Sequence, residues 1–94
     1  MSMIVKQDDN AYTIDIPDDG EKYTLIYERK CWKVFTDESA MNEEARFYDY
    51  HIKNGKLAAL NNAFIYIMAC EGQCAKELEA EVVVICKELD TQGG

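Results

Sequence analysis

The chain has 94 residues, enough for one domain with a single hydrophobic core. Its 18 Asp and Glu residues against 10 Lys and Arg give a formal net charge of −8, and this excess repels nucleic acid and anionic membranes. Hydrophobic residues make up 48% of the chain, which excludes an acidic disordered tail.

The first 36 residues have the alternating pattern of β-strands. Within 11–16, Tyr12, Ile14 and Ile16 fall on one face and polar side chains on the other. A Pro-Asp-Asp-Gly turn follows at 17–20. The other β-rich segments are 3–5, 23–27 and 31–35. The pattern predicts a three-stranded antiparallel meander, with residues 3–5 as a short additional edge strand.

From residue 37 the spacing of apolar side chains becomes helical. Met41, Ala45, Tyr48 and Ile52 follow one another at steps of four, three and four, which places them on one helical stripe. Thr36 or Ser39 can cap such a helix. Four acidic residues lie near its first turn, where the positive end of the helix dipole stabilises negative charge: Asp37, Glu38, Glu43 and Glu44. We therefore predict a helix over 37–54.

A hairpin within residues 45–60 is the alternative to this helix. The segment 47–52 is aromatic and rich in β-formers, and Asn54-Gly55 is a strong hairpin-turn signal. The capping residues and the apolar stripe favour the helix, which Asn54-Gly55 would then end.

The remaining residues predict two further helices. Over 56–71, one face carries Leu57, Leu60, Phe64, Ile67 and Met68, and residues 63–70 are apolar on nearly every side, as in a central buried helix. After Gly72, a last helix has an apolar stripe made of Cys74, Leu78, Val82, Ile85 and Leu89. The sequence thus predicts a single α+β domain over 1–94, in which a small antiparallel meander of three to four strands in the N-terminal half packs against two or three helices in the C-terminal half.

Cysteines are the first candidates for chemistry. Cys31, Cys70, Cys74 and Cys86 would be numerically sufficient, with His51, for a tetrahedral metal site. The Cys70-x3-Cys74 spacing matches neither the paired Cys-x2-Cys of zinc sites nor the Cys-x2-Cys of redox sites. We therefore expect free thiols packed as small apolar side chains, no cofactor and no metal; a Cys-based metal-binding or redox protein is the alternative.

No catalytic constellation stands out elsewhere. His51 is the single histidine, and no Ser or Cys lies beside it in sequence. The paired carboxylates are better explained as loop, turn and helix-end residues, and the five glycines are too scattered for a phosphate-binding loop. We expect that the protein is not an enzyme.

The acidic residues of the last helix are the main candidates for a partner-binding site. Segments 1–36, 37–55 and 56–94 carry net charges of −2, −3 and −3. Glu77, Glu81 and Glu88 share a helical face on which neighbours four apart are spaced by about 6 Å. This spacing is close to that of phosphates on a DNA strand, so the row would mimic nucleic acid toward a basic groove. The alternative is a solvated face that keeps the protein soluble.

Location and self-association complete the expectations. The N-terminus has neither a basic region nor a long apolar segment, so we expect a cytoplasmic protein without a signal peptide. The longest nearly uncharged stretch, 57–70, is too short to cross a bilayer. Two apolar helices exceed what a thin sheet covers, which favours a homodimer through the helices.

In size, acidity and lack of a catalytic motif, the chain resembles the small inhibitors made by phages and mobile elements, including anti-CRISPR proteins, and toxin-immunity proteins. The resemblance implies an inhibitor or regulator. The negative charge favours a basic partner, such as a nucleic-acid-binding enzyme, and no direct contact to nucleic acid or membrane. The partner-binding residues predicted are Asp37, Glu38, Glu43, Glu44, Glu77, Glu81 and Glu88. A dimeric structural or adaptor subunit is the other alternative.

Overall fold

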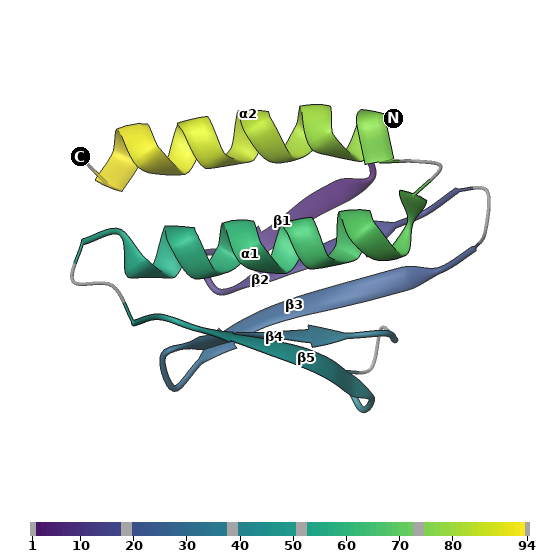
Figure 1. Cartoon of the computed structure of the whole chain (residues 1–94), viewed down its shortest axis with the longest axis horizontal. Helices are drawn as coiled ribbons and strands as arrows, with labels where there is room; N and C mark the ends of the chain where they lie inside the picture. The colour runs from purple at the N-terminus through teal and green to yellow at the C-terminus, as the bar shows by residue number, and fades with distance from the viewer. Residues whose placement is uncertain (1, 18–19, 38–39, 51–52, 73–74, 94) are drawn as a thin grey trace.

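The computed structural model describes residues 2–17, 20–37, 40–50, 53–72 and 75–93. In this part of the chain, a five-stranded antiparallel sheet is followed by two helices that lie side by side on one of its faces (Figure 1). The strand order in the sheet is the order in the chain, β1-β2-β3-β4-β5. The elements are β1 (Ile4–Asp8), β2 (Ala11–Asp15), β3 (Lys22–Glu28), β4 (Cys31–Phe35), β5 (Glu43–Tyr48), α1 (Gly55–Cys70) and α2 (Ala75–Gly93).

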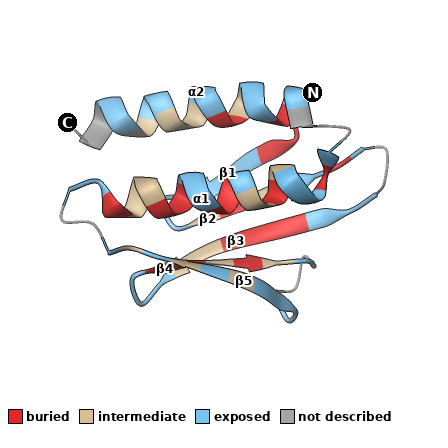
Figure 2. Ribbon diagram, viewed as in Figure 1, coloured by how far each residue is buried: buried red, intermediate tan, exposed pale blue. Residues whose placement is uncertain are grey.

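The register of the strands builds one apolar face. Tyr12 lies opposite Leu25, Leu25 opposite Val34, and Val34 opposite Ala45, so these side chains point to the same side of the sheet. Tyr12, Leu25 and Val34 are each 1% exposed or less, because the helices cover this side of the sheet (Figure 2). The α+β class and the early strands predicted from period-2 alternation, including the short first one, are therefore confirmed.

Helix α1 packs through a face that mixes large and small side chains. Leu60, Phe64 and Ile67 are fully buried, and Ala59 and Ala63 between them allow close approach to the sheet. The ring of Phe64 meets the ring of Tyr12 edge-on, with centroids 5.9 Å apart. Among the described residues α1 has more buried side chains than α2, as predicted for the most buried helix, although Ile65 on its opposite face is 50% exposed.

The fifth strand corrects the predicted helix over 37–54. Residues 43–48 extend the sheet beside β4, and Ala45 and Tyr48, which the helical stripe placed together, lie on opposite faces. Phe47 points toward α1, where its ring lies 5.8 Å from that of Tyr66. The open edge of β4 offers backbone hydrogen bonds and apolar cover that an isolated short helix lacks, and this outweighs the local capping signals.

Asn54-Gly55 begins α1 and does not end a helix. Asn54 has φ of 53°, and Gly55 is the first helical residue. The hairpin alternative was right that residues near 47 are extended, but their partner is β4, across the loop that contains Ala40 and Met41. His51 and Ile52 lie outside the described residues.

A tryptophan joins the sheet to the start of α1. The Nε1 atom of Trp32 donates to the carbonyl oxygen of Lys56 at 2.9 Å, and the indole is 1% exposed. Tyr27 and Trp32 are in ring contact at 5.2 Å, and the Tyr27 hydroxyl donates to Asp49 at 3.0 Å. Aromatic packing and these bonds fix the direction in which the chain enters α1. Within the described residues, neither helix combines the length and apolarity needed to span a membrane.

Candidate functional site

The acidic residues around position 40 serve the loop and the strand that contain them. One Asp37 carboxylate oxygen accepts the backbone N–H groups of Met41 and Asn42, at 3.1 and 3.3 Å. Glu43 and Glu44 lie on β5, so the prediction that they form part of a first helical turn is wrong. Glu38 lies outside the described residues. A common acidic helix end is therefore absent from the described part of this segment.

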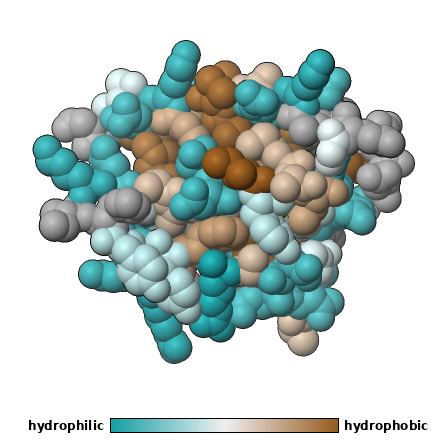
Figure 3. All heavy atoms as spheres, viewed as in Figure 1, coloured by the Kyte–Doolittle hydropathy of each residue, from teal (hydrophilic) through white to brown (hydrophobic). Residues whose placement is uncertain are grey.

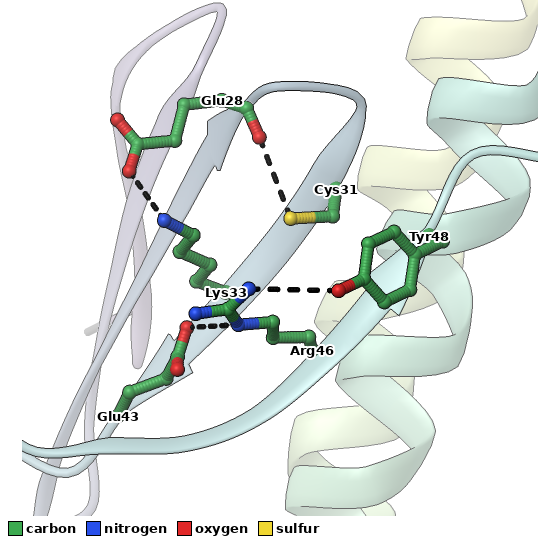
Figure 4. A network of polar contacts seen from close by, with 6 residues as sticks. All are labelled: Glu28, Cys31, Lys33, Glu43, Arg46 and Tyr48. Atoms are coloured by element: carbon green, nitrogen blue, oxygen red, sulfur yellow. Dashed lines mark hydrogen bonds and ion pairs between the residues drawn. The ribbon is translucent and has the colours of Figure 1, made fainter.

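Glu43 belongs to a set of paired charges on the sheet face away from the helices (Figure 4). Arg46 donates to Glu43 at 2.7 Å, and this bond holds the pKa of the guanidinium above its usual value. Lys33 donates to Glu28 at 2.6 Å, which lowers the pKa of that carboxyl group. Because each of these acids faces a base, this part of the sheet has little surplus charge for attracting a partner.

Glu81 has a structural role that the sequence pattern did not reveal. Its two carboxylate oxygens accept the backbone N–H groups of Met3 and Ile4, at 3.0 and 2.9 Å. The carboxylate of Glu81 is thus turned toward β1 and leaves the predicted acidic row. Glu77 and Glu88, its other members, are separated by about 16 Å along the helix axis at 1.5 Å per residue. Without Glu81, the row no longer has the regular, phosphate-like spacing of charges that the sequence predicted.

The acids of α2 border its exposed face on two sides. Leu78 and Val82 are buried, and Ile85, Cys86 and Leu89 are partly buried beside them. The angle of about 100° per residue places the exposed side chains around the opposite half of the helix. Glu77 and Glu88 lie on the flank next to β1, where Glu88 acts electrostatically on Lys6. Glu79 and Asp90, which sequence reasoning missed, lie on the flank next to α1. None of Glu77, Glu79 or Asp90 has an ion-pair partner among the described residues.

An apolar ridge runs between these two acidic flanks. Its members are Ala80, Val83 and Val84, and the two valines are 43% and 54% exposed. Lys76 and Lys87 lie at its ends, and a shallow depression beside Lys76, Glu79, Ala80 and Val83 marks one side of it. Figure 3 shows hydrophobic atoms in the middle of the face that the two helices form, with hydrophilic side chains around them. We call this surface, Lys76 to Asp90 on the outer side of α2, the α2 ridge.

The cysteines are dispersed. Cys31 is buried on the sheet, where its thiol donates to the Glu28 carbonyl oxygen at 3.4 Å, and Cys86 is half-buried beside Asn61 of α1. Cys70 is exposed at the end of α1, contrary to its predicted place in the core, and Cys74 lies outside the described residues. Burial raises the pKa of the Cys86 thiol, which disfavours the reactive thiolate. The described residues contain no cluster of three or more His, Cys, Asp or Glu side chains suited to a metal ion.

Comparison of the chain with protein-family models, with curated proteins and with solved structures found no match. The α2 ridge is the candidate functional site: an exposed apolar strip bordered on both sides by carboxylates, of which Glu77, Glu79 and Asp90 have no ion-pair partner among the described residues.

Proposed function

We propose that the protein is a non-catalytic binding protein whose α2 ridge docks onto a basic surface of another protein. The observation that carries this proposal is the arrangement of α2, in which Val83 and Val84 are exposed between Glu77 and Glu88 on one side and Glu79 and Asp90 on the other. Protein interfaces commonly have this organisation, with an apolar centre that excludes water and a charged rim.

The two parts of the ridge contribute differently to binding. Burial of the valines supplies the apolar contribution, at about 25 cal/mol per Å² removed from water. The carboxylates attract and orient a basic partner, and they accelerate association because the whole chain carries a charge of −8. Nucleic-acid-binding proteins present basic surfaces of this kind, which makes them the partner class favoured here. Occupying such a surface would inhibit or regulate the partner without chemistry.

The experiment is capture of partners from a host lysate on immobilised protein at low and high salt. We expect a basic protein that binds at low salt and is released as salt rises. The double variant Glu77→Gln/Glu88→Gln should weaken capture by about tenfold or more. The matched control is Glu43→Gln/Glu44→Gln on β5, which removes the same number of charges and should leave capture unchanged. Salt-independent capture, or equal loss in both variants, would contradict the proposal.

A second candidate function is self-association through the same ridge. If two copies of α2 cross antiparallel about Val83, Lys76 of one copy lies opposite Asp90 of the other, and Lys87 lies opposite Glu79. These four ion pairs around a valine contact make the ridge self-complementary, as a two-fold interface requires. This arrangement favours a dimer, in which the protein would act as a structural or adaptor subunit.

The variant Lys76→Glu/Lys87→Glu separates the two candidates. It removes every cross-pair of the dimer, so it should convert a dimer to a monomer in sedimentation velocity. The same change makes the ridge more acidic and should strengthen binding to a basic partner. A wild-type protein that sediments as a monomer at all concentrations excludes the dimer and leaves the basic partner as the remaining occupant.

A further inference from the structure

A cavity lies at the end of the domain where the β1–β2 turn, the start of α1 and the last turns of α2 meet. Its volume is about 310 Å³, and Leu57, Leu60 and Leu89 form its apolar walls. Tyr12 and Trp32, from the sheet, form the aromatic part of the lining. This volume is at the lower end of the range for small-molecule sites, about 300–1,000 Å³, and suits a ligand with a single ring.

Lys56 places a positive charge in the lining of this cavity. Its Nζ atom donates to the Asn10 side-chain oxygen at 2.6 Å and lies 4.7 Å from the centre of the Tyr27 ring. In a chain with 18 acidic residues, no carboxylate of the described residues lies within ion-pair distance of this ammonium group. An ammonium group has three donors. One bonds to Asn10 and the group also faces the Tyr27 ring, which leaves at least one donor for a ligand.

Tyr12 lines the same cavity and carries a hydroxyl group. The residue as a whole is 1% exposed, and its hydroxyl makes no hydrogen bond within the described part of the chain; the hydroxyl is not fully enclosed, so water or a ligand can reach it. Burial raises the pKa of Tyr12, so at neutral pH the hydroxyl is protonated and available to donate.

We propose that this cavity binds a small organic carboxylate whose apolar body lies among the leucines and whose carboxylate is held by Lys56. The apolar walls, the unpaired ammonium group and the Tyr12 hydroxyl all favour an apolar molecule that carries hydrogen-bond acceptors. Asp9, which also lines the cavity, does not cancel the charge of Lys56, because its carboxylate is paired with Lys6 at 3.1 Å. This site is separate from the α2 ridge, and the proposal does not depend on the protein partner.

The single tryptophan of the chain provides the measurement, because Trp32 lines the cavity. We would titrate the protein with 3-phenylpropionate and follow tryptophan fluorescence, with 3-phenylpropanamide as the uncharged ligand of the same shape. We expect saturation with a Kd of about 1 mM or below for the acid, and binding at least about tenfold weaker for the amide. No saturable change at about 10 mM, or equal binding of the two ligands, would overturn the proposal.

Three lysine variants test the role of the ammonium group. Lys56→Met keeps most of the aliphatic stem and the backbone carbonyl that Trp32 needs, and it should weaken binding of the acid by about tenfold or more. Lys56→Arg retains the charge and should retain binding. Lys76→Met, which removes a lysine from the first turn of α2, is the matched control. Amide NMR spectra establish that each variant is folded, and unaltered affinity in folded Lys56→Met would exclude the assigned role.

Discussion

The carboxylate of Glu81 accepts the backbone N–H of Ile4 at 2.9 Å, although the two residues are 77 positions apart in the chain. Its other oxygen accepts the N–H of Met3 at 3.0 Å. Since β1 is an edge strand, its first residues have no further strand to bond with, and Glu81 supplies the acceptors instead. This contact attaches α2 to β1, the edge strand on the opposite side of the sheet from β5.

Replacing Glu81 by Gln should therefore destabilise the fold. Gln has one acceptor oxygen where Glu81 uses two, and its amide nitrogen is a donor, so one backbone N–H loses its partner. We expect the free energy of unfolding to fall by about 1–3 kcal/mol in urea denaturation. Glu77→Gln, one turn earlier on the exposed side, is the control and should change stability by less than about 0.5 kcal/mol. Equal effects of the two substitutions would contradict the structural role of Glu81.

Gly55 should not tolerate a methyl group. In most helices, replacing Gly by Ala stabilises by about 1 kcal/mol. At Gly55, a Cβ atom would overlap the carboxylate of Asp49, which also accepts the Tyr27 hydroxyl at 3.0 Å. We therefore expect Gly55→Ala to lower the melting temperature and cost about 1–3 kcal/mol.

Two further variants isolate this clash. At Gly72 a Cβ would meet no atom of the described residues within 4 Å, so Gly72→Ala should not destabilise. The double variant Gly55→Ala/Asp49→Ala removes the obstructing carboxylate and should recover part of the lost stability relative to the sum of the single changes. Additive effects of the two single substitutions would show that the clash is not the cause.

The stability of the protein should decrease with rising pH above about 10. Burial and the hydrogen bond to Glu21, at 3.0 Å, raise the pKa of Tyr23 in the folded state. The unfolded chain then loses the Tyr23 proton at a lower pH than the folded chain. Stability is complete below the unfolded pKa and falls as the pH rises toward the folded pKa.

Tyr23→Phe tests this linkage. Urea denaturation at a series of pH values from about 9 to 12 should show a shallower loss of stability in the variant than in the wild-type protein. Stability measured at neutral pH corrects for the lost hydrogen bond. Identical pH profiles of the two proteins would exclude Tyr23 as a source of the alkaline loss.

Tyr12→Phe should have an unusual effect for a core substitution. The ring would keep its contacts with Trp32 and Phe64, at 5.7 and 5.9 Å between centroids. The hydroxyl that is removed has no hydrogen-bond partner in the described part of the chain and can be reached by solvent, so its loss breaks no bond within these residues and leaves no buried group unpaired. We expect the free energy of unfolding, measured without ligand, to change by less than about 1 kcal/mol. A loss above about 1 kcal/mol would show that the hydroxyl is bonded.

The sequence correctly predicted the elements for which the local residue pattern and the tertiary packing favour the same secondary structure. Alternation around Tyr12 and Ile14 identified a strand with one buried face, and the helical spacing of Leu60, Phe64 and Ile67 identified the packed face of α1. Both predictions succeeded because burial of one face is the dominant favourable contribution to each element. At 43–48 local signals conflicted, and the neighbouring β4 edge decided in favour of a strand.

Some features of the candidate site can also be predicted from the sequence, whereas others depend on the tertiary structure. The acidity of α2 and its apolar stripe can be recognised from composition and a period of 3.6 residues. Only the fold shows that Glu81 bonds to β1 and that Glu43 pairs with Arg46. It also shows that Glu79 and Asp90 border the exposed valines. The cavity lined by Lys56 is formed by residues from four elements and the β1–β2 turn, so no contiguous sequence motif identifies it.

The sequence by itself determined the class of this protein: an acidic α+β fold with strands first and helices last. Its periodicities and charges are local properties that survive in any arrangement of the elements. Only the tertiary structure decided which carboxylates are used within the fold and which face solvent, because that choice depends on neighbours brought together from distant parts of the chain.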